Sequence, residues 1–504
     1  MKTAYFFVGL GIAYGFGCQG EMGSDGSGGE TSSTGPTTPC CDTTGSGPGS
    51  GTAGTASTAG TSSTGSASTG TGGSEPLPCG DPTTFESGLT PSSEIHVATS
   101  GSDASGDGSA GNPYATIAHA ASLATPGTSV VIHQGTYAGD TYLADYGGTE
   151  GAPIWIGGAQ GEARPVVQGG ANGFHLSGVR YLVLHDLEIT GGEANGINCD
   201  DGGNVASEDA TRWVVFRGLS IHDIGTGGNN DCLKLSGVND FWVQRSDFAR
   251  CGGGMSGSGI DHVGCHRGVV SHSTFVEMSG NGVQCKGGST DIVVTANRFT
   301  EAGERAVNMG GSTGFEFFRP PLTNGENAEA RRIHVLANVI EGGTAALGFV
   351  GCVDCLAANN TIIDPERWPL RILQETSTSS GGYTFLPASN GRVINNVVYY
   401  SASDVGGAHV NVGGDTDPGS FTFVSNLWFA HDDPGSSTPN LPVSEQGGIV
   451  GSDPGFVNAG GGDYHLAGGS PAIGAGSALP ELSGDNDGNC YAAAPSVGAF
   501  EGNP

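Results

Sequence analysis

Three cations stand near two aspartates in the middle of a strongly acidic chain. The 504 residues contain 18 Lys and Arg against 50 Asp and Glu, so cations gathered beside carboxylates are unexpected. The cations are Lys234, Lys286 and Arg305, and the aspartates are Asp231 and Asp261. Cations that neutralise a substrate carboxylate, with a lysine whose pKa its surroundings lower, could remove the proton next to that carboxylate. The simpler interpretation is a solvated contact between lysine and aspartate.

Short strands in register must position these residues. Aligning the glycine-rich turns places five segments at one strand position: GINCD (196–200), CLKLS (232–236), GIDHV (259–263), GVQCK (282–286) and AVNMG (306–310). Side chains alternate along a strand, so the second residue of each segment points inward. The third residues form an outward column of Asn198, Lys234, Asp261, Gln284 and Asn308. The fifth residues, which include Lys286, form a second outward column.

These strands belong to a longer repeat. A unit of about 22 to 27 residues recurs from about Val179 to Phe429, which is typical of one coil of a parallel β-helix. An asparagine precedes an apolar strand residue by two positions in several units: Asn297, Asn338, Asn360, Asn396 and Asn426. Stacked asparagines hydrogen-bond one another along a coil, so we interpret this ladder as structural. Insertions at about 313–330 and 375–388 interrupt the repeat and could wall a groove.

The segment before the repeat resembles a known end cap. Residues Ile95–Tyr137 predict a strand, a short helix over Ala115–Leu123 and a second strand. They resemble the N-terminal cap of the pectate-lyase-like superfamily, and residues 453–502 resemble the closing segment of its bacterial members. The resemblance implies an all-β fold, a right-handed parallel β-helix (solenoid) with an N-terminal helical cap over its apolar lumen. We place the β-helix at 79–445 and its C-terminal closing segment at 446–504.

The first 78 residues have a different character. Residues 1–18 contain Lys2, an apolar run and small residues around Cys18, which is typical of an export signal. The end of this signal resembles a bacterial lipobox, whose cysteine carries lipid; plain secretion is the alternative. Residues 19–78 are nearly all Gly, Ser, Thr, Pro and Ala and predict a flexible tether. We expect an outer-membrane or cell-surface lipoprotein, or an extracellular protein.

The charge limits the possible partners. A net charge of −32 argues against nucleic acid and against anionic membrane surfaces as partners. An anionic polysaccharide remains possible where local cations reverse the potential. We expect a monomer that acts on a polysaccharide and contacts the membrane only through its lipid.

Two segments resemble family 9 polysaccharide lyases. NNDCLKL (229–235) is similar to one motif of that family, and GSGID (257–261) stands where its calcium-binding aspartates lie one coil later. The resemblance implies calcium as a cofactor, Asp231 and Asp261 as metal ligands, and Lys286 as the catalytic base. Glycine and serine replace two carboxylates of that family's site, which leaves few oxygens for the ion.

A second resemblance points to the same reaction. Residues 283–311 resemble family 6 polysaccharide lyases, in which a lysine and a downstream arginine act together; this implies catalytic roles for Lys286 and Arg305, assisted by Lys234. Both resemblances favour a lyase that cleaves a uronic-acid-containing polysaccharide by β-elimination. Further residues are expected to bind substrate on this face or at its border: Asn198, Gln284, Asn308, Arg371, His266 and Arg267.

Two other functions remain open. NCD (198–200) and NDC (230–232) resemble motifs of family 28 glycoside hydrolases, the polygalacturonases. Asp200 and Asp231 would then form an inverting pair about 6.5–9.5 Å apart, although that family's glycine-rich motif here lacks its histidine. The other alternative is a solenoid that binds glycans or builds the cell surface without catalysis.

Several reactive side chains favour structural roles. His262 alternates into the lumen, which predicts a hydrogen-bonded core histidine. The cysteines at 199, 232 and 285 recur at one strand position and suggest small residues that fill the lumen. Cys352 and Cys355 could form a local disulfide or remain as stacked thiols.

Overall fold

The computed structural model describes residues 79–225, 228–253, 256–482 and 484–502. The predicted export signal (1–18), its Cys18 and the predicted tether (19–78) lie outside these residues. No helix in the described part of the chain is long and apolar enough to span a membrane.

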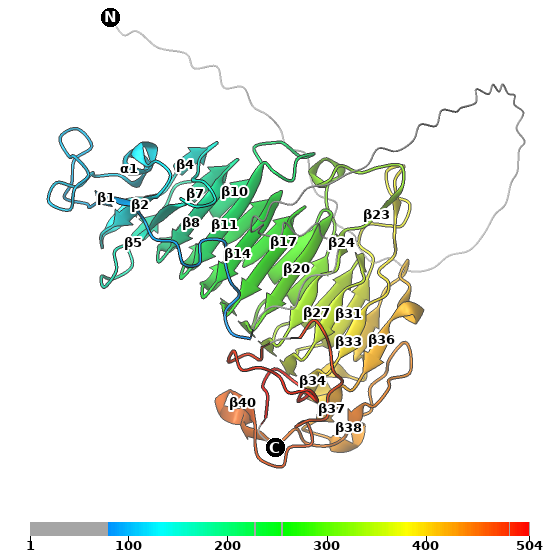
Figure 1. Ribbon diagram of the computed structural model, residues 1–504. Helices are drawn as coiled ribbons and strands as arrows, with labels where there is room; N and C mark the ends of the chain where they lie inside the picture. The colour runs from blue at the N-terminus through cyan, green and yellow to red at the C-terminus, as the bar shows by residue number, and fades with distance from the viewer. Residues whose placement is uncertain (1–78, 226–227, 254–255, 483, 503–504) are drawn as a thin grey trace, which may run out of the picture. The chain divides into compact units, whose positions relative to one another are not determined.

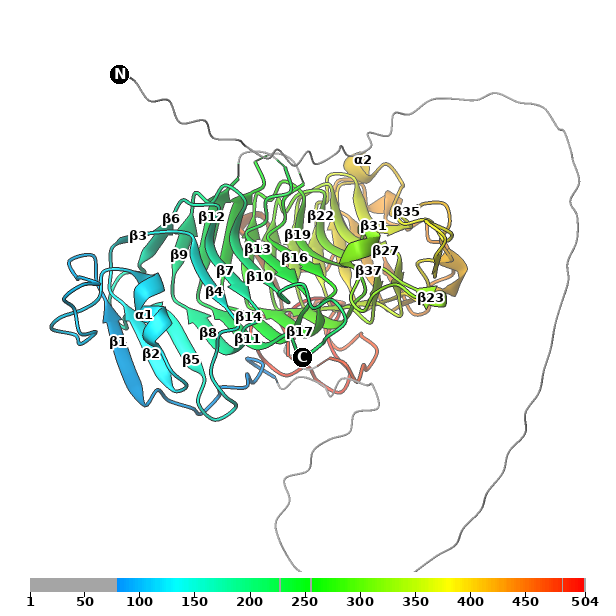
Figure 2. The same cartoon turned by 90° about the horizontal axis from the view of Figure 1, so that it is seen from above.

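Three parallel sheets wrap around one apolar lumen (Figure 1, Figure 2). From β2 to β22 successive strands fall in sheets 1, 2 and 3 in turn, so each coil there adds one strand to each sheet. The coil β8, β9, β10, for example, pairs strand by strand with the next coil, β11, β12, β13. The chain is thus a right-handed parallel β-helix, with the handedness of nearly all parallel crossover connections.

The strands of each sheet follow in chain order. Sheet 1 contains β1 (Ser93–Val97), β2 (Thr128–Ile132), β5 (Ile154–Gly158), β8 (Arg180–His185), β11 (Thr211–Arg217), β14 (Val238–Gln244), β17 (His266–Ser271), β20 (Ser289–Thr295), β24 (Ala330–Arg331), β25 (His334–Leu336), β28 (Cys352–Val353), β29 (Leu356–Ala358), β33 (Arg392–Ile394) and β36 (Thr422–Val424). Sheet 2 contains β3 (Thr136–Ala138), β6 (Val166–Gln168), β9 (Glu188–Thr190), β12 (Ser220–Ile224), β15 (Asp247–Cys251), β18 (Thr274–Val276), β21 (Arg298–Thr300), β26 (Val339–Glu341), β30 (Thr361–Ile363), β34 (Val397–Tyr400), β37 (Leu427–Ala430) and β38 (Ile449–Val450). Sheet 3 contains β4 (Thr141–Ala144), β7 (Asn172–Ser177), β10 (Asn195–Asp200), β13 (Leu233–Ser236), β16 (Ile260–Val263), β19 (Asn281–Lys286), β22 (Arg305–Gly310), β27 (Ala345–Val350), β31 (Trp368–Leu373) and β35 (Val410–Val412).

A short helix covers the N-terminal end of the lumen. Helix α1 (Ile117–Leu123) buries Ile117, Ala120 and Ala121 and lies beside β1, β2 and β4 (Figure 2). It begins two residues later than predicted because Thr116 is its N-cap, whose side-chain oxygen accepts a hydrogen bond from the His119 N–H. Such a cap satisfies a backbone donor that the first turn cannot. The only other α-helix in the described residues is α2 (Ala402–Val405).

The predicted register of sheet 3 is confirmed. The five residues predicted to point inward are fully buried and aligned: Ile197, Leu233, Ile260, Val283 and Val307. Elsewhere in the lumen, the rings of Phe248, Phe275 and Phe299 stack with centroids 5.0 and 4.7 Å apart. Burying each such side chain contributes about 1.5–3 kcal/mol, so the lumen holds the coils together.

The asparagine ladder also forms as predicted. Each Nδ2 donates to the Oδ1 of the asparagine one coil further on, at 2.9–3.0 Å, from Asn297 to Asn426. All five side chains are buried at 0–1% exposure. The ladder ends at Glu445, which accepts from Asn426 Nδ2 at 2.7 Å. These bonds satisfy polar groups that the turn between sheets 1 and 2 would otherwise leave unpaired.

The cysteines differ in part from the prediction. Cys199 and Cys285 are buried thiols as expected, but Cys232 forms a disulfide with Cys251 and is not a simple lumen-filling residue. The turn that precedes β13 brings Cys232 against the end of β15, a contact that spacing alone does not reveal. Two further disulfides join Cys352 to Cys355 and Cys79 to Cys490.

The terminal segments cover two of the three sheets. Phe85 and Leu89 of the N-terminal segment pack on Trp155, Val183 and Val215 on the outer face of sheet 1. The C-terminal segment adds β38 to sheet 2. The segment then packs on the outer face of sheet 2, with Phe500 against Val339 and Ile363, and contains the antiparallel pair β39 (Phe456–Asn458) and β40 (Asp463–Leu466). Sheet 3 carries the predicted site on its outer face.

Candidate active site

The outer face of sheet 3 carries one continuous column of aligned residues. The strand pairings align ten residues: Tyr142, His175, Asn198, Lys234, Asp261, Gln284, Asn308, Gly348, Arg371 and Asn411. Adjacent members lie about 4.8 Å apart, the spacing of strands in a sheet. The column therefore has the shape of a site for an extended polymer.

Two insertions border this column. The first insertion (313–330) bonds to the turn that follows β10. There the guanidinium of Arg319 donates to both carboxylate oxygens of Asp201 at 2.6 and 3.2 Å. The second pairs with the first through β32 (Thr384–Phe385) and β23 (Glu326–Asn327). Both partners of the Arg319–Asp201 ion pair are at most 9% exposed. The insertions thus form a fixed wall along the sheet 3 edge that leads into sheet 1.

Two lysines share one buried carboxylate at the centre of the column. Lys234 Nζ donates to Asp261 Oδ2, and Lys286 Nζ lies 3.3 Å from the same oxygen. Lys234 Nζ also lies 3.4 Å from Asp231 Oδ2, and Lys286 Nζ donates to Gln284 Oε1 at 3.2 Å. Both aspartates are fully buried, whereas the lysine side chains remain 17% and 15% exposed. The lysines are therefore the members of this cluster that a substrate can contact.

The charges of the cluster are strongly coupled. Burial raises the pKa of Asp231 to about 6, against the opposing effect of Lys234. Burial acts in the same direction on Asp261, but Lys234 and Lys286 outweigh it and hold that pKa below its ordinary value. Burial lowers the pKa of Lys234, yet Asp261 and Asp231 more than compensate and raise it. Lys234 is therefore a permanent ammonium ion at neutral pH.

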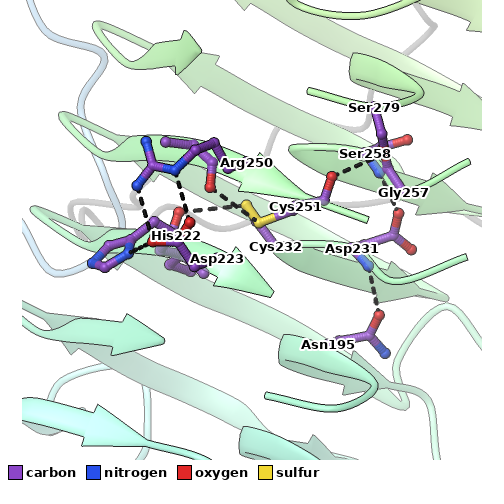
Figure 3. Close-up of a disulfide and its surroundings, with 12 residues drawn as sticks. Asn195, His222, Asp223, Asp231, Cys232, Arg250, Cys251, Gly257, Ser258 and Ser279 are labelled. Carbon is purple, nitrogen blue, oxygen red and sulfur yellow. Dashed lines mark hydrogen bonds and ion pairs between the residues drawn. A yellow bond between two sulfur atoms is a disulfide. The ribbon is translucent and has the colours of Figure 1, made fainter. Parts of the chain in front are cut away.

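Asp231 is held in place by its neighbours along sheet 3 (Figure 3). Its backbone N–H donates to Asn195 Oδ1 at 2.9 Å, and its Oδ1 accepts from the Ser258 N–H at 2.8 Å. The next residue, Cys232, is tied to Cys251 by the disulfide seen beside it in Figure 3. These contacts fix the carboxylate that faces Lys234.

The other predicted site residues divide between the column and its surroundings. Asn198 donates to Asp200 Oδ2 at 2.8 Å, and Asn308 is fully buried with an Oδ1 that has no partner among the described residues. Arg305 donates to Glu375 Oε1 at 2.8 Å and is 8% exposed. All three lie on sheet 3, as predicted.

His266 and Arg267 lie elsewhere. They begin β17 in sheet 1, where the buried His266 bonds through Nδ1 to Thr290 Oγ1 at 2.9 Å. Arg267 donates to Asp240 and Glu208 at 2.8 Å each. No contact in the described residues joins either side chain to the lysine cluster, so the structure supplies no support for substrate binding by this pair.

The lumen histidine behaves as predicted. His262 is fully buried and donates from Nδ1 to the Gln284 carbonyl oxygen at 2.8 Å. Burial lowers its pKa to about 4. It is a neutral core residue that supports the strand carrying Asp261.

The residues present do not fit a calcium ion. Calcium takes six to eight oxygen ligands, whereas only Asp231 and Asp261 offer carboxylates at this point. Both already contact the ammonium of Lys234, and within the described ranges no group of three or more His, Cys, Asp or Glu could hold a metal. The ammonium occupies the position between the two carboxylates that a cation would need.

Comparisons with known proteins support the fold. No protein-family model and no curated protein sequence matches the chain. Among solved structures, pectate lyase Pel9A aligns with a TM-score of 0.51 at 17% identity, over 83% of this chain and 98% of that one. The chain therefore shares the parallel β-helix fold of that structure. XylC in complex with xylose (TM-score 0.47, 11% identity, 82% and 99% covered) and an alginate lyase from Paenibacillus sp. str. FPU-7 (0.40, 14%, 64% and 97%) are also similar.

Proposed function

We propose that this protein is a lyase that cleaves a uronic-acid-containing polysaccharide by β-elimination on the outer face of sheet 3. The observation that supports this most strongly is the pair of partly exposed lysines that share the buried Asp261. In a chain of net charge −32, this pair presents ammonium groups to the substrate, while the two carboxylates that balance them stay buried behind, and such an arrangement favours an anionic polymer at this point.

The two lysines differ in a way that suggests their roles. Lys234 contacts two carboxylates and has a raised pKa, so it serves as the fixed charge that neutralises the substrate carboxylate. Lys286 contacts one carboxylate and the amide oxygen of Gln284, and it serves as the base. In its amine form Lys286 takes the proton α to the uronate carboxylate, and the glycosidic oxygen at the β position then leaves with the bond electrons. The leaving oxygen takes a proton from water, and a carbon–carbon double bond forms in the sugar that lost its α proton, which becomes the new non-reducing end.

A screen of polyuronates with two readouts tests this function. Elimination produces a conjugated double bond that absorbs in the near ultraviolet, whereas hydrolysis produces reducing ends without that absorbance. On an identified substrate, Lys286→Ala should lower kcat by about 10²–10⁴, and Lys234→Met should mainly raise KM. Parental turnover by Lys286→Ala would refute the assignment of the base.

Metal dependence supplies a second test. Because the ammonium of Lys234 stands between the two carboxylates, turnover should be unchanged after extensive treatment with a chelator. Loss of turnover that calcium restores would show that the ion binds despite this arrangement.

A glycoside hydrolase is the second candidate. The pKa of Asp231, raised to about 6 by burial, suits a general acid, and the lowered pKa of Asp200 suits a base. Burial opposes the shift of Asp200, but hydrogen bonds from Ser177 and His175 outweigh it. However, Asp231 has no exposed surface and lies behind Lys234. Asp231→Asn should abolish turnover in a hydrolase and leave most of it in a lyase.

We also propose export to the cell surface through lipid at Cys18, on the basis of the signal sequence. Expressed in a bacterial host, the parent should sediment with membranes. A Cys18→Ala variant should lose that association, and retention of the variant in the membrane fraction would contradict the anchor.

A further inference from the structure

Two arginines stack on one tryptophan beyond the lysine cluster. The guanidinium carbons of Arg367 and Arg371 lie 4.2 and 4.3 Å from the centre of the Trp368 ring. Neither arginine takes part in an ion pair among the described residues, and Arg371 donates from Nε to Asn411 Oδ1 at 3.1 Å. A guanidinium stacked on an aromatic ring keeps N–H groups at its edge for a planar anion. The remaining donors of Arg371 are therefore oriented and available.

Arg305 reaches the same place across a glycine. Gly348 lies between Asn308 and Arg371 in the column, and a Cβ at this position would come within 2.9 Å of Arg305 Cδ. Because Gly348 has no side chain, the side chain of Arg305 can lie in the space above it. Arg305 is more than nine-tenths buried, and its Nε has no partner in the described part of the chain. An unpaired buried donor is costly unless something else binds it.

These cations are close enough to affect one another. The pKa of Arg371 is lowered, first by burial and next by the charge of Arg305. Glu375 is the only carboxylate in an ion pair with any of the three arginines among the described residues. Glu375 and Glu304 oppose the shift of the Arg371 pKa, but of the three arginines only Arg305 is in an ion pair with a carboxylate in the described part of the chain.

We infer that Arg305 and Arg371, oriented by Trp368, form a second carboxylate-binding subsite for the same polymer chain that reaches Lys286. Three strand steps separate β19 from β31, or about 14 Å at the spacing of strands in a sheet. A chain of sugars spans this distance and a single sugar does not. The inference rests on the proposed function and narrows it: the substrate carries uronates in succession, so a polyuronate is preferred to a neutral polymer with isolated uronates.

The length of the substrate tests this subsite. Trimers and hexamers of galacturonate and of guluronate are compared as substrates for the parent, Arg371→Ala and Arg371→Lys. For whichever hexamer the parent cleaves, Arg371→Ala should lower kcat/KM by about tenfold to a hundredfold, whereas cleavage of the trimer should change little. Arg371→Lys should lower kcat/KM for the hexamer less than Arg371→Ala does, because lysine keeps the positive charge. The control Arg332→Ala, an arginine bound to Asp291 in sheet 1, should leave both rates unchanged.

Binding separates the subsite from the reaction. Calorimetric titration of the same hexamers into Lys286→Ala, with and without Arg371→Ala, requires no turnover. Hexamer affinity that does not depend on Arg371 overturns the subsite, even if the protein proves to be a lyase. Affinity that falls with Arg371→Ala supports the subsite, even if no elimination product is found. Absence of both binding and cleavage for every hexamer overturns the subsite and the proposed function together.

Discussion

Replacement of Asp231 by asparagine should stabilise the protein at neutral pH. Burial raises the pKa of this carboxyl from an ordinary 3.8 to about 6, which corresponds to about 3 kcal/mol of cost when the group is ionised. Asparagine keeps the size of the side chain and the oxygen that accepts the Ser258 N–H. Lys234 still has Asp261 as a partner. The free energy of unfolding should therefore rise in the variant.

The pH dependence of this gain has a defined direction. Because the pKa is higher in the folded protein, that state binds more protons than the unfolded one between the two pKa values. The contribution of Asp231 to stability is thus fully present below about pH 4 and is lost as the pH rises through about 6. The variant has no such titration, so its advantage over the parent should vanish near pH 4 and reach about 3 kcal/mol above pH 7.

Urea unfolding followed by circular dichroism across this pH range measures the difference. The control is Asp209→Asn, because Asp209 is 70% exposed and its replacement should give curves parallel to those of the parent. If Asp231→Asn is less stable than the parent at pH 8, ionised Asp231 is a net stabilising partner of Lys234 and the reasoning about its burial is wrong.

Three further outcomes are expected. Val283→Asp should unfold the coil or lower its melting temperature sharply, because it places an unpaired carboxyl in a fully buried lumen position at a cost of several kcal/mol; a parental melting curve would contradict the register. Asn360→Ala removes the four hydrogen bonds of the Asn360 side chain and should cost at least about 2 kcal/mol, whereas Asn440→Ala at an exposed position should cost little in the same denaturation assay. Mild proteolysis should remove residues 20–78 and leave a fragment that begins near Cys79, and N-terminal sequencing of an equally resistant, longer fragment would count against the predicted tether.

The coils could be predicted from the sequence because the pattern that determines them lies within short segments of the chain. Alternation within GIDHV or GVQCK fixes which residues enter the lumen, and a shift of one residue would place Asp261 and Lys286 inside it. The ladder asparagines repeat at one point of the turn, so their alignment follows from the period. For this reason both the register and the column containing Lys234 agree with the structure.

Contacts across long stretches of sequence could not be predicted in the same way. Arg305 meets Glu375, 70 residues later, and Arg319 meets Asp201 across 118 residues. Both contacts depend on how an insertion folds, and insertions carry no period. The burial of Asp261 was likewise not expected, since outward positions on a solenoid are normally exposed. Arg371 was expected to bind substrate, but only the structure shows that it stacks on Trp368 with Arg367 and lies near enough to Arg305 to be affected by its charge.

The disulfide between Cys79 and Cys490 determines how the protein would resist mechanical force. A solenoid that is pulled from its terminal strand can open one coil at a time, because each coil contacts only its neighbours. Here tension applied to residues before Cys79 reaches the covalent link to Cys490 before it reaches β1. The load passes into the C-terminal segment packed on sheet 2, so the force is shared by many coils, and the terminal strand is not peeled away first.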